Sequence, residues 1–116
     1  MTLQATEKEC AANAVAPRVS LADIEAAIQR KFFFSGGEAA RAYDPTTARE
    51  AAVSSLDVLT ICLVVMHNGF TVIGKSAPAS PENFNAELGR KLAYEDAVRQ
   101  LWPLMGYALR DKLAGF

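Results

Sequence analysis

The sequence predicts an α+β fold, and three observations lead to this prediction. Apolar residues recur at helical spacing after residue 20, an Asn-Gly pair separates two runs of strand-forming residues, and a long helical pattern follows residue 80. At 116 residues, the chain has room for one domain. Residues 1–17 show no periodicity, so we expect them to form a disordered arm and residues 18–116 to form a single α+β domain.

The first helix is predicted from a start signal and a periodic apolar face. Ser20 is placed to cap free N–H groups, and Asp23, three residues later, completes a capping box. Apolar residues then recur every three or four positions, at Leu21, Ile24, Ile28 and Phe32. We expect a helix over residues 21–33, followed by a loop over residues 35–44.

A short second helix is predicted after Asp44-Pro45, because Asp caps a helix well and Pro fits its first turn. We expect this helix to occupy residues 48–55. A single long helix over residues 45–67 is the alternative. The β-branched residues that follow Leu56 favour the shorter helix.

A β-hairpin is predicted around Asn68-Gly69, with strands over residues 60–67 and 70–74. Asn-Gly is typical of a type I′ turn, in which both central residues have positive φ. The first strand is apolar on both faces, which indicates that both of its faces are covered in the folded protein.

The C-terminal helix is predicted to begin at Ser80-Pro81-Glu82, with Ser as the cap and an acid near the positive end of the helix dipole. It should run to Trp102, where Pro103 introduces a kink or a break before a second segment over residues 104–113. The predicted order is an N-terminal helix, a short second helix, a β-hairpin and a long C-terminal helix kinked near Pro103. One side of this helix carries small residues that let another backbone approach: Ala86, Gly89, Ala93 and Ala97.

Charge and hydropathy argue against several classes of partner. The chain has 12 basic and 13 acidic residues and a net charge of -1, which favours neither nucleic acid nor an anionic membrane. The longest apolar run, residues 58–66, is too short to span a bilayer. No basic segment followed by an apolar one marks a signal peptide at the N-terminus. We therefore expect a cytoplasmic protein that binds neither nucleic acid nor membrane.

Residues Gly69–Ser76 match the phosphate-loop pattern G-x-x-x-x-G-K-S. That motif requires a strand, then a loop, then a helix that begins at the Lys-Ser pair. Here the four intervening residues are strong strand formers, and the Ala-Pro-Ala-Ser-Pro that follows cannot continue a helix. We interpret the match as accidental.

No set of residues predicts catalysis or a metal site. His67 is the only histidine, and Cys10 and Cys62 are the only cysteines. A structural zinc site needs four ligands of these kinds, and a catalytic nucleophile needs a paired base. We expect a non-enzymatic protein without a metal or other cofactor.

The sequence does offer side chains for a small anionic ligand near the start of the C-terminal helix, where basic groups can bind a phosphate and aromatic rings can stack on a base. The candidates are Lys75, Ser76, Asn83, Arg90, Tyr94, Arg99 and Tyr107. Ordinary helix capping also explains the polar residues at Ser80–Asn83, and packing also explains the tyrosines.

Matches in order along the chain resemble a known family. The matching positions are Arg18-Val19-Ser20, Ile24-Glu25, Thr60-Ile61-Cys62, Asn68-Gly69-Phe70-Thr71-Val72, Gly74, Ser76-Ala77, Pro81-Glu82-Asn83-Phe84-Asn85, Gly89-Arg90-Lys91, Ala93, Ala97, Trp102-Pro103-Leu104, Gly106-Tyr107 and Leu109. Over residues 17–113 the chain resembles the small phage and prophage protein family named for gene 49 and gene 66 products of enterobacterial podoviruses. This resemblance implies an accessory protein acting in the bacterial cytoplasm, and it brings no catalytic residues.

The function expected from these observations is that of a non-enzymatic binding module acting on a host protein. The alternative is a binder of a small anionic ligand, such as a nucleotide signal in host defence. We also expect a homo-oligomer, because an isolated hairpin is marginally stable and a second copy would cover both its apolar strand and the small-residue side of the helix.

Overall fold

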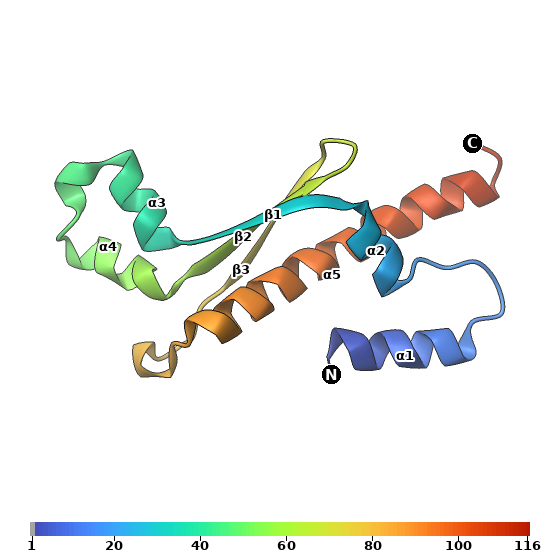
Figure 1. The fold of residues 1–116 in the computed structure, drawn as a ribbon, viewed down its shortest axis with the longest axis horizontal. Helices are drawn as coiled ribbons and strands as arrows, with labels where there is room; N and C mark the ends of the chain where they lie inside the picture. Colours follow the sequence, from blue (N-terminus) through green and yellow to red (C-terminus); the bar gives the residue numbers. More distant parts are fainter. Residues whose placement is uncertain (1) are drawn as a thin grey trace.

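The computed structural model describes residues 2–116, which form helices packed against a three-stranded antiparallel sheet of order β1-β2-β3 (Figure 1). The elements are α1 (Leu3–Asn13), α2 (Leu21–Ala27), β1 (Ile28–Ser35), α3 (Gly36–Tyr43), the 3-10 helix η1 (Pro45–Thr47), α4 (Ala51–Ser55), η2 (Leu56–Val58), β2 (Thr60–Met66), β3 (Thr71–Ser76), η3 (Pro81–Asn83) and α5 (Ala86–Leu113). The α+β class and the long C-terminal helix are confirmed. The molecule is elongated, with extents of 55 × 29 × 17 Å.

The first predicted helix is correct at its start and wrong at its end. Ser20 Oγ accepts a hydrogen bond from the Asp23 N–H at 3.0 Å, and the Asp23 carboxylate accepts one from the Ser20 N–H at 2.9 Å, so the capping box is present. The helix ends at Ala27, however, and residues 28–35 form β1, which pairs with β2. Pairing with an apolar central strand outweighs the helical spacing of Ile28 and Phe32.

The segment over residues 35–44, expected to be a loop, is mostly the helix α3. Ser35 caps it by accepting a hydrogen bond from the Glu38 N–H at 3.0 Å. Its two glycines pack closely against neighbouring side chains. A Cβ on Gly37 would lie 1.9 Å from Asp57 Oδ1, and one on Gly36 would lie 3.0 Å from the side chain of Leu59.

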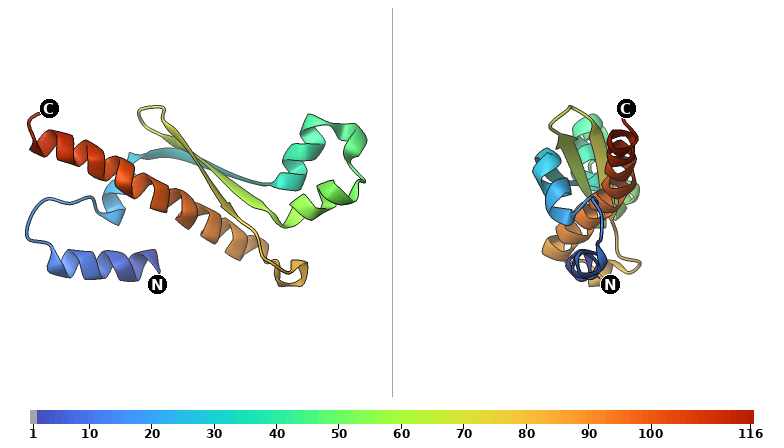
Figure 2. Two further views of the ribbon diagram at one scale, coloured as in Figure 1. Left: turned by 180° about the vertical axis from the view of Figure 1, so that it is seen from behind. Right: turned by 90° about the vertical axis from the view of Figure 1, so that its right-hand side faces the viewer.

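The second helix is shorter than expected. Asp44 caps the turn η1 through the Thr46 N–H, as its sequence position predicts, and α4 then spans only residues 51–55. The alternative of one helix over residues 45–67 is wrong, because β2 begins at Thr60. Together, α3 and α4 form a lobe beyond one end of the sheet (Figures 1 and 2).

The hairpin is confirmed, but its turn is not of type I′. Only Gly69 has positive φ, at 87°, whereas type I′ requires it at Asn68 as well. The Gly69 N–H donates to the Met66 carbonyl at 2.9 Å, and the Met66 N–H donates to the Phe70 carbonyl at 2.8 Å. These bonds define a three-residue loop that ends in a left-handed glycine.

The long helix α5 starts later than predicted and continues past the proline. Its cap is Asn85, whose Oδ1 accepts from the Leu88 N–H at 2.9 Å, and residues 81–83 form only the short turn η3. The helix is uninterrupted through Pro103, so the predicted break does not occur. The carbonyl that Pro103 leaves unpaired belongs to Arg99, and both residues are exposed, so water can satisfy it.

The core lies between α5 and one face of the sheet, as the end-on view in Figure 2 shows. From β2, this face contributes Thr60, Cys62, Val64 and Met66, all buried. The small-residue side of α5 packs directly on β3, where a Cβ on Gly74 would lie 2.0 Å from the Ala93 carbonyl oxygen. The sheet therefore covers this side of α5 within one chain, and no second copy is needed there.

The N-terminal arm contains the helix α1, which the lack of periodicity did not predict. The Glu7 carboxylate accepts hydrogen bonds from the Arg18 guanidinium at 2.6 and 3.1 Å and from the Leu21 N–H at 2.9 Å, and Leu3 is buried. These contacts tie α1 to the start of α2. Met1 lies outside the described residues, and the division into an arm and a domain at residue 17 stays a prediction.

Candidate binding surface

In the described part of the chain, residues 2–116, one face of the sheet has no helix over it (Figure 2). Alternate residues of each strand point away from α5, and on this face they are mainly large and apolar. Phe32 is 42% exposed and Ile73 is 58% exposed, which is high for large apolar side chains on a sheet. We call this surface the open face; its apolar members are Phe32, Phe34, Ile61, Leu63, Val65 and Ile73.

The charged positions of the open face are all basic. By register, Arg30 of β1 and Lys75 of β3 share this face, and Thr71 is its other polar position among the paired residues. The Arg30 guanidinium lies 4.8 Å from the centre of the Phe32 ring, so its charge stays above the apolar surface. The open face thus combines an apolar centre with positive charge on both outer strands.

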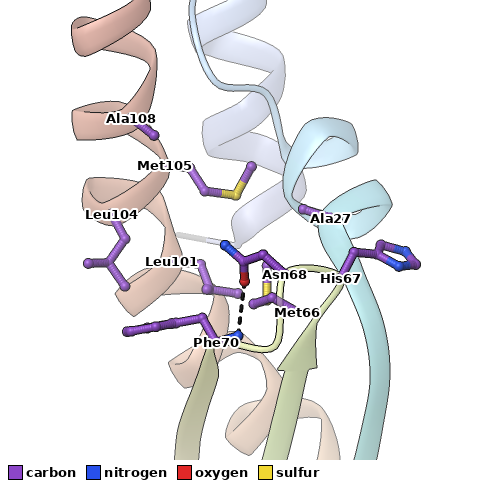
Figure 3. A pocket seen from close by; sticks show the side chains of 9 residues that line it. All are labelled: Ala27, Met66, His67, Asn68, Phe70, Leu101, Leu104, Met105 and Ala108. Carbon is purple, nitrogen blue, oxygen red and sulfur yellow. Dashed lines mark hydrogen bonds between the residues drawn. The ribbon is translucent and has the colours of Figure 1, made fainter. Parts of the chain in front are cut away.

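An apolar groove of about 420 Å³ lies between the hairpin turn and the second half of α5 (Figure 3). Leu101, Leu104 and Met105 line it from α5, and Phe70 lies beside Leu104 at its rim. Figure 3 shows the His67 ring directed away from the groove. His67 is exposed.

The residues predicted to bind an anion are spread over the molecule. Ser76 and Asn83 line a cavity of about 80 Å³ at the end of the hairpin. Arg90 lines a different cavity, with Phe34 and Glu38. The remaining candidates also lie apart: Tyr94 lies beside Lys31 of β1, Lys75 and Arg99 are exposed, and Tyr107 is 73% exposed near the C-terminal end.

The predicted anion site at the start of the C-terminal helix needs a correction. Residues 81–83 form a three-residue turn, so the aligned N–H groups of an α-helix begin only after Asn85.

The interpretation of the phosphate-loop match as accidental is confirmed, because residues 71–76 form the strand β3 and no helix follows Lys75 and Ser76 directly.

Two titratable groups, one buried and one partly buried, have pKa values raised by desolvation. Burial raises the pKa of the Cys62 thiol, and burial, helped by the negative charge of Glu25, raises the pKa of Tyr94. Both groups therefore stay neutral at neutral pH. Within residues 2–116, no group of three or more His, Cys, Asp or Glu side chains is placed to hold a metal ion.

The part of the chain that runs from α2 through the sheet to the end of α5 matches the model of a known family. Residues 19–113 match the model of the phage protein (N4 Gp49/phage Sf6 gene 66) family. The chain belongs to this family. The resemblance noted from sequence is thereby confirmed, and α1 lies outside the matched part.

Searches of curated proteins and of solved structures found no match to the chain. No helix within residues 2–116 is long and apolar enough to cross a membrane.

Most residues of the open face lie on β2 and β3, and both of these strands were predicted from the sequence. Phe32 and Phe34 were missed as surface residues because residues 28–33 were assigned to a helix and no strand was predicted here, although three consecutive phenylalanines are a signal for a strand.

Proposed function

We propose that this phage protein is a non-enzymatic binding module that binds a protein of the bacterial host, in the host cytoplasm, through the open face. The observation that carries the proposal is the uncovered apolar surface of the sheet. Contiguous exposed apolar surface on a folded domain is typical of a protein interaction site. The family supports a phage protein, and the choice of a host partner rests on this surface alone.

The charge of the open face indicates the chemistry of the partner. Arg30 and Lys75 flank its apolar centre, and the face has no acidic residue at its paired positions. A partner surface with apolar side chains surrounded by Asp or Glu would match both features. Binding through such a surface should weaken as salt is raised, because the charges lie at an accessible rim.

Affinity capture from an infected host with two matched variants tests this proposal. Ile73→Glu places an acid on the open face, and Leu113→Glu introduces the same side chain near the end of α5, at a residue of similar exposure, 56% against 58%. We expect Ile73→Glu to abolish capture of a host protein and Leu113→Glu to retain it. Capture that is equally strong with both variants would contradict the use of the open face.

The alternative, a small anionic ligand, has weaker support because its candidate residues lie apart. Arg90 and Ser76 line separate cavities, and the cavity that contains Ser76 and Asn83 is too small for a nucleotide. Thermal melting with a panel of nucleotides separates the two functions. A clear rise in Tm with one nucleotide would favour the ligand over the host protein.

A further inference from the structure

The two outer strands of the sheet differ in how their free edges are treated. In β3, two of the main-chain groups that point away from β2 are bonded to α5. The Lys75 N–H donates to Asp96 Oδ2 at 2.9 Å, and the Gln100 side-chain amide donates to the Ile73 carbonyl at 2.8 Å. These bonds block the β3 edge against pairing with another strand.

The β1 edge has no such protection. The Gly36 N–H donates to the Leu59 carbonyl at 2.8 Å, which fixes the hydrogen-bonding phase of the ladder between β1 and β2. Because successive residues alternate in direction, Phe32 and Phe34 direct their main-chain groups toward β2, whereas Lys31 and Phe33 direct theirs outward. Among residues 2–116, no side chain or main-chain group donates to or accepts from these outward groups.

The usual features that protect an edge strand are also missing from the centre of β1. The strand has eight residues and no proline, and its one irregularity lies at the end between Ile28 and Arg30. Lys31 is charged, but its ammonium group lies 4.1 Å from the centre of the Tyr94 ring, so it folds back onto α5. The free edge is therefore a regular strand with aromatic residues at its middle.

The overall size of the chain shows how much surface is left without cover. Its radius of gyration is 17.3 Å, compared with about 13 Å for a compact domain of this length. Its accessible surface is 7925 Å², compared with about 6,200 Å² for a compact monomer of this mass. The excess is about twice the roughly 800 Å² that each partner loses in a standard interface. One chain thus has enough spare surface for an interface with a second copy as well as one with a host protein.

We propose that two copies of this chain pair β1 with β1 in antiparallel orientation, which forms a continuous six-stranded sheet with the two open faces side by side. An antiparallel strand is self-complementary about a two-fold axis, so a second copy fits this edge without any further adaptation. With the axis at Phe32, the outward groups of Lys31 meet those of Phe33 in the second copy. This register places Phe32 opposite Phe32 and Arg30 opposite Phe34, and it keeps the two Lys31 side chains apart.

The first test measures the mass of the full chain by size-exclusion chromatography with light scattering at micromolar concentration. We expect about twice 12.5 kDa for the unmodified chain. Lys31→Pro removes an outward N–H without touching the bonds to β2, so it should give a folded monomer. Thr71→Pro makes the same change on the β3 edge and should leave the dimer intact. A monomeric unmodified chain, or a dimer lost only with Thr71→Pro, would overturn the proposal.

A cross-linking test checks the register and does not depend on a proline. In a Cys10→Ser background, Phe32→Cys places two thiols directly opposite each other, with Cα atoms about 4.5 Å apart, which a disulfide can bridge. Phe34→Cys places them about 13 Å apart, because residue 34 lies opposite residue 30. Oxidation should cross-link only the Phe32→Cys chain. Cross-linking of Phe34→Cys alone, or of neither variant, would refute this register.

The same variants separate this inference from the proposed function. A monomeric Lys31→Pro chain retains the open face, so it should still capture a host protein, with reduced strength because it presents one face where the dimer presents two. Loss of capture by Ile73→Glu in a chain that stays dimeric supports the open face independently. An extended host segment could pair with β1 in place of a second copy. In that case the unmodified chain would be monomeric and would capture a host protein, and Lys31→Pro would abolish this capture. That result would refute the dimer.

Discussion

The contact between Gly74 and α5 makes a sharp prediction about stability. Replacing Gly74 by Ala would place a Cβ 2.0 Å from the Ala93 carbonyl oxygen and 2.8 Å from the Ala97 nitrogen. Both atoms belong to the helix backbone, so neither can rotate away. Since carbon atoms pack no closer than about 3.4 Å, α5 and β3 must separate by roughly 1.4 Å.

This separation determines the size of the effect. It would stretch the two bonds from Asp96 and Gln100 to the β3 edge, now 2.9 and 2.8 Å long, beyond hydrogen-bonding range. Loss of two bonds at about 1 kcal/mol each, added to an overpacking cost of about 1–3 kcal/mol, gives a destabilisation of roughly 3–5 kcal/mol. The Tm should fall by roughly 10–20 °C.

Gly106→Ala is the matched control, because Gly106 lies in the same helix and a Cβ there would meet nothing within 4 Å. It should stabilise the protein by up to about 1 kcal/mol, since alanine is the better helix former. Urea unfolding followed by circular dichroism, at one protein concentration for all chains, measures both free energies. A Gly74→Ala cost below about 1 kcal/mol would refute the close packing of α5 on β3.

The other predictions concern the N-terminal helix, the single tryptophan and the two cysteines. The Arg18 guanidinium lowers the pKa of Glu7 below its ordinary value of 4.5, so this ion pair stabilises the attachment of α1 above pH 4.5, and the stabilisation is lost as the pH falls through the lowered pKa. Protease cleavage within α1 should therefore rise at that low pH. Glu7→Gln should give the same cleavage already at neutral pH. The Trp102 Nε1–H donates to a main-chain carbonyl before α2 at 3.1 Å, so Trp102→Phe should cost about 1 kcal/mol by urea unfolding, and no loss would mean that this bond is absent in solution. Cys10 is exposed and Cys62 is buried with a raised pKa, so a thiol reagent should label Cys10 at once and Cys62 only at the rate of unfolding; equal labelling rates would contradict the packing of β2.

The hairpin and the long helix could be predicted from sequence because their signals are local. A glycine at the turn, alternation in the strand after it, and a helical pattern following residue 80 each depend on neighbouring residues alone. The turn type was wrong because Asn-Gly permits a type I′ turn without requiring it. His67 is the first of the three loop residues, and the bond from the Gly69 N–H to the Met66 carbonyl includes it in the turn.

The strand β1 could not be predicted in the same way because its partner is distant in the chain. Ile28 and Phe32 continue a helical spacing. Only pairing with β2, which lies some thirty residues later in the chain, decides between helix and strand. The loop predicted over residues 35–44 is mostly the helix α3, and the contacts that Gly36 and Gly37 make with Leu59 and Asp57 also join residues that are distant in the chain. Arg30, Phe32 and Phe34 of the open face lie on β1, so their place on this face was hidden from the sequence for the same reason.

The apolar character of β2 on both faces predicted that both faces are covered, and within one chain this holds for one face only. One cover is α5, and the other is missing from the single chain, where Ile61, Leu63 and Val65 are only partly buried. That part of the interpretation connects a sequence pattern to the proposed partner more directly than any of the ligand candidates.

The lobe of α3 and α4 begins and ends at a single point of the sheet. The bond between Gly36 and Leu59 closes the ladder there, so residues 36–59 leave β1 and return to β2 at adjacent positions. A short turn could join the same two strands without moving any other part of the sheet. This makes the lobe an independently exchangeable segment, in which insertions and deletions cost little because loop closure depends only weakly on length. Chains with quite different lobes could therefore share the same scaffold.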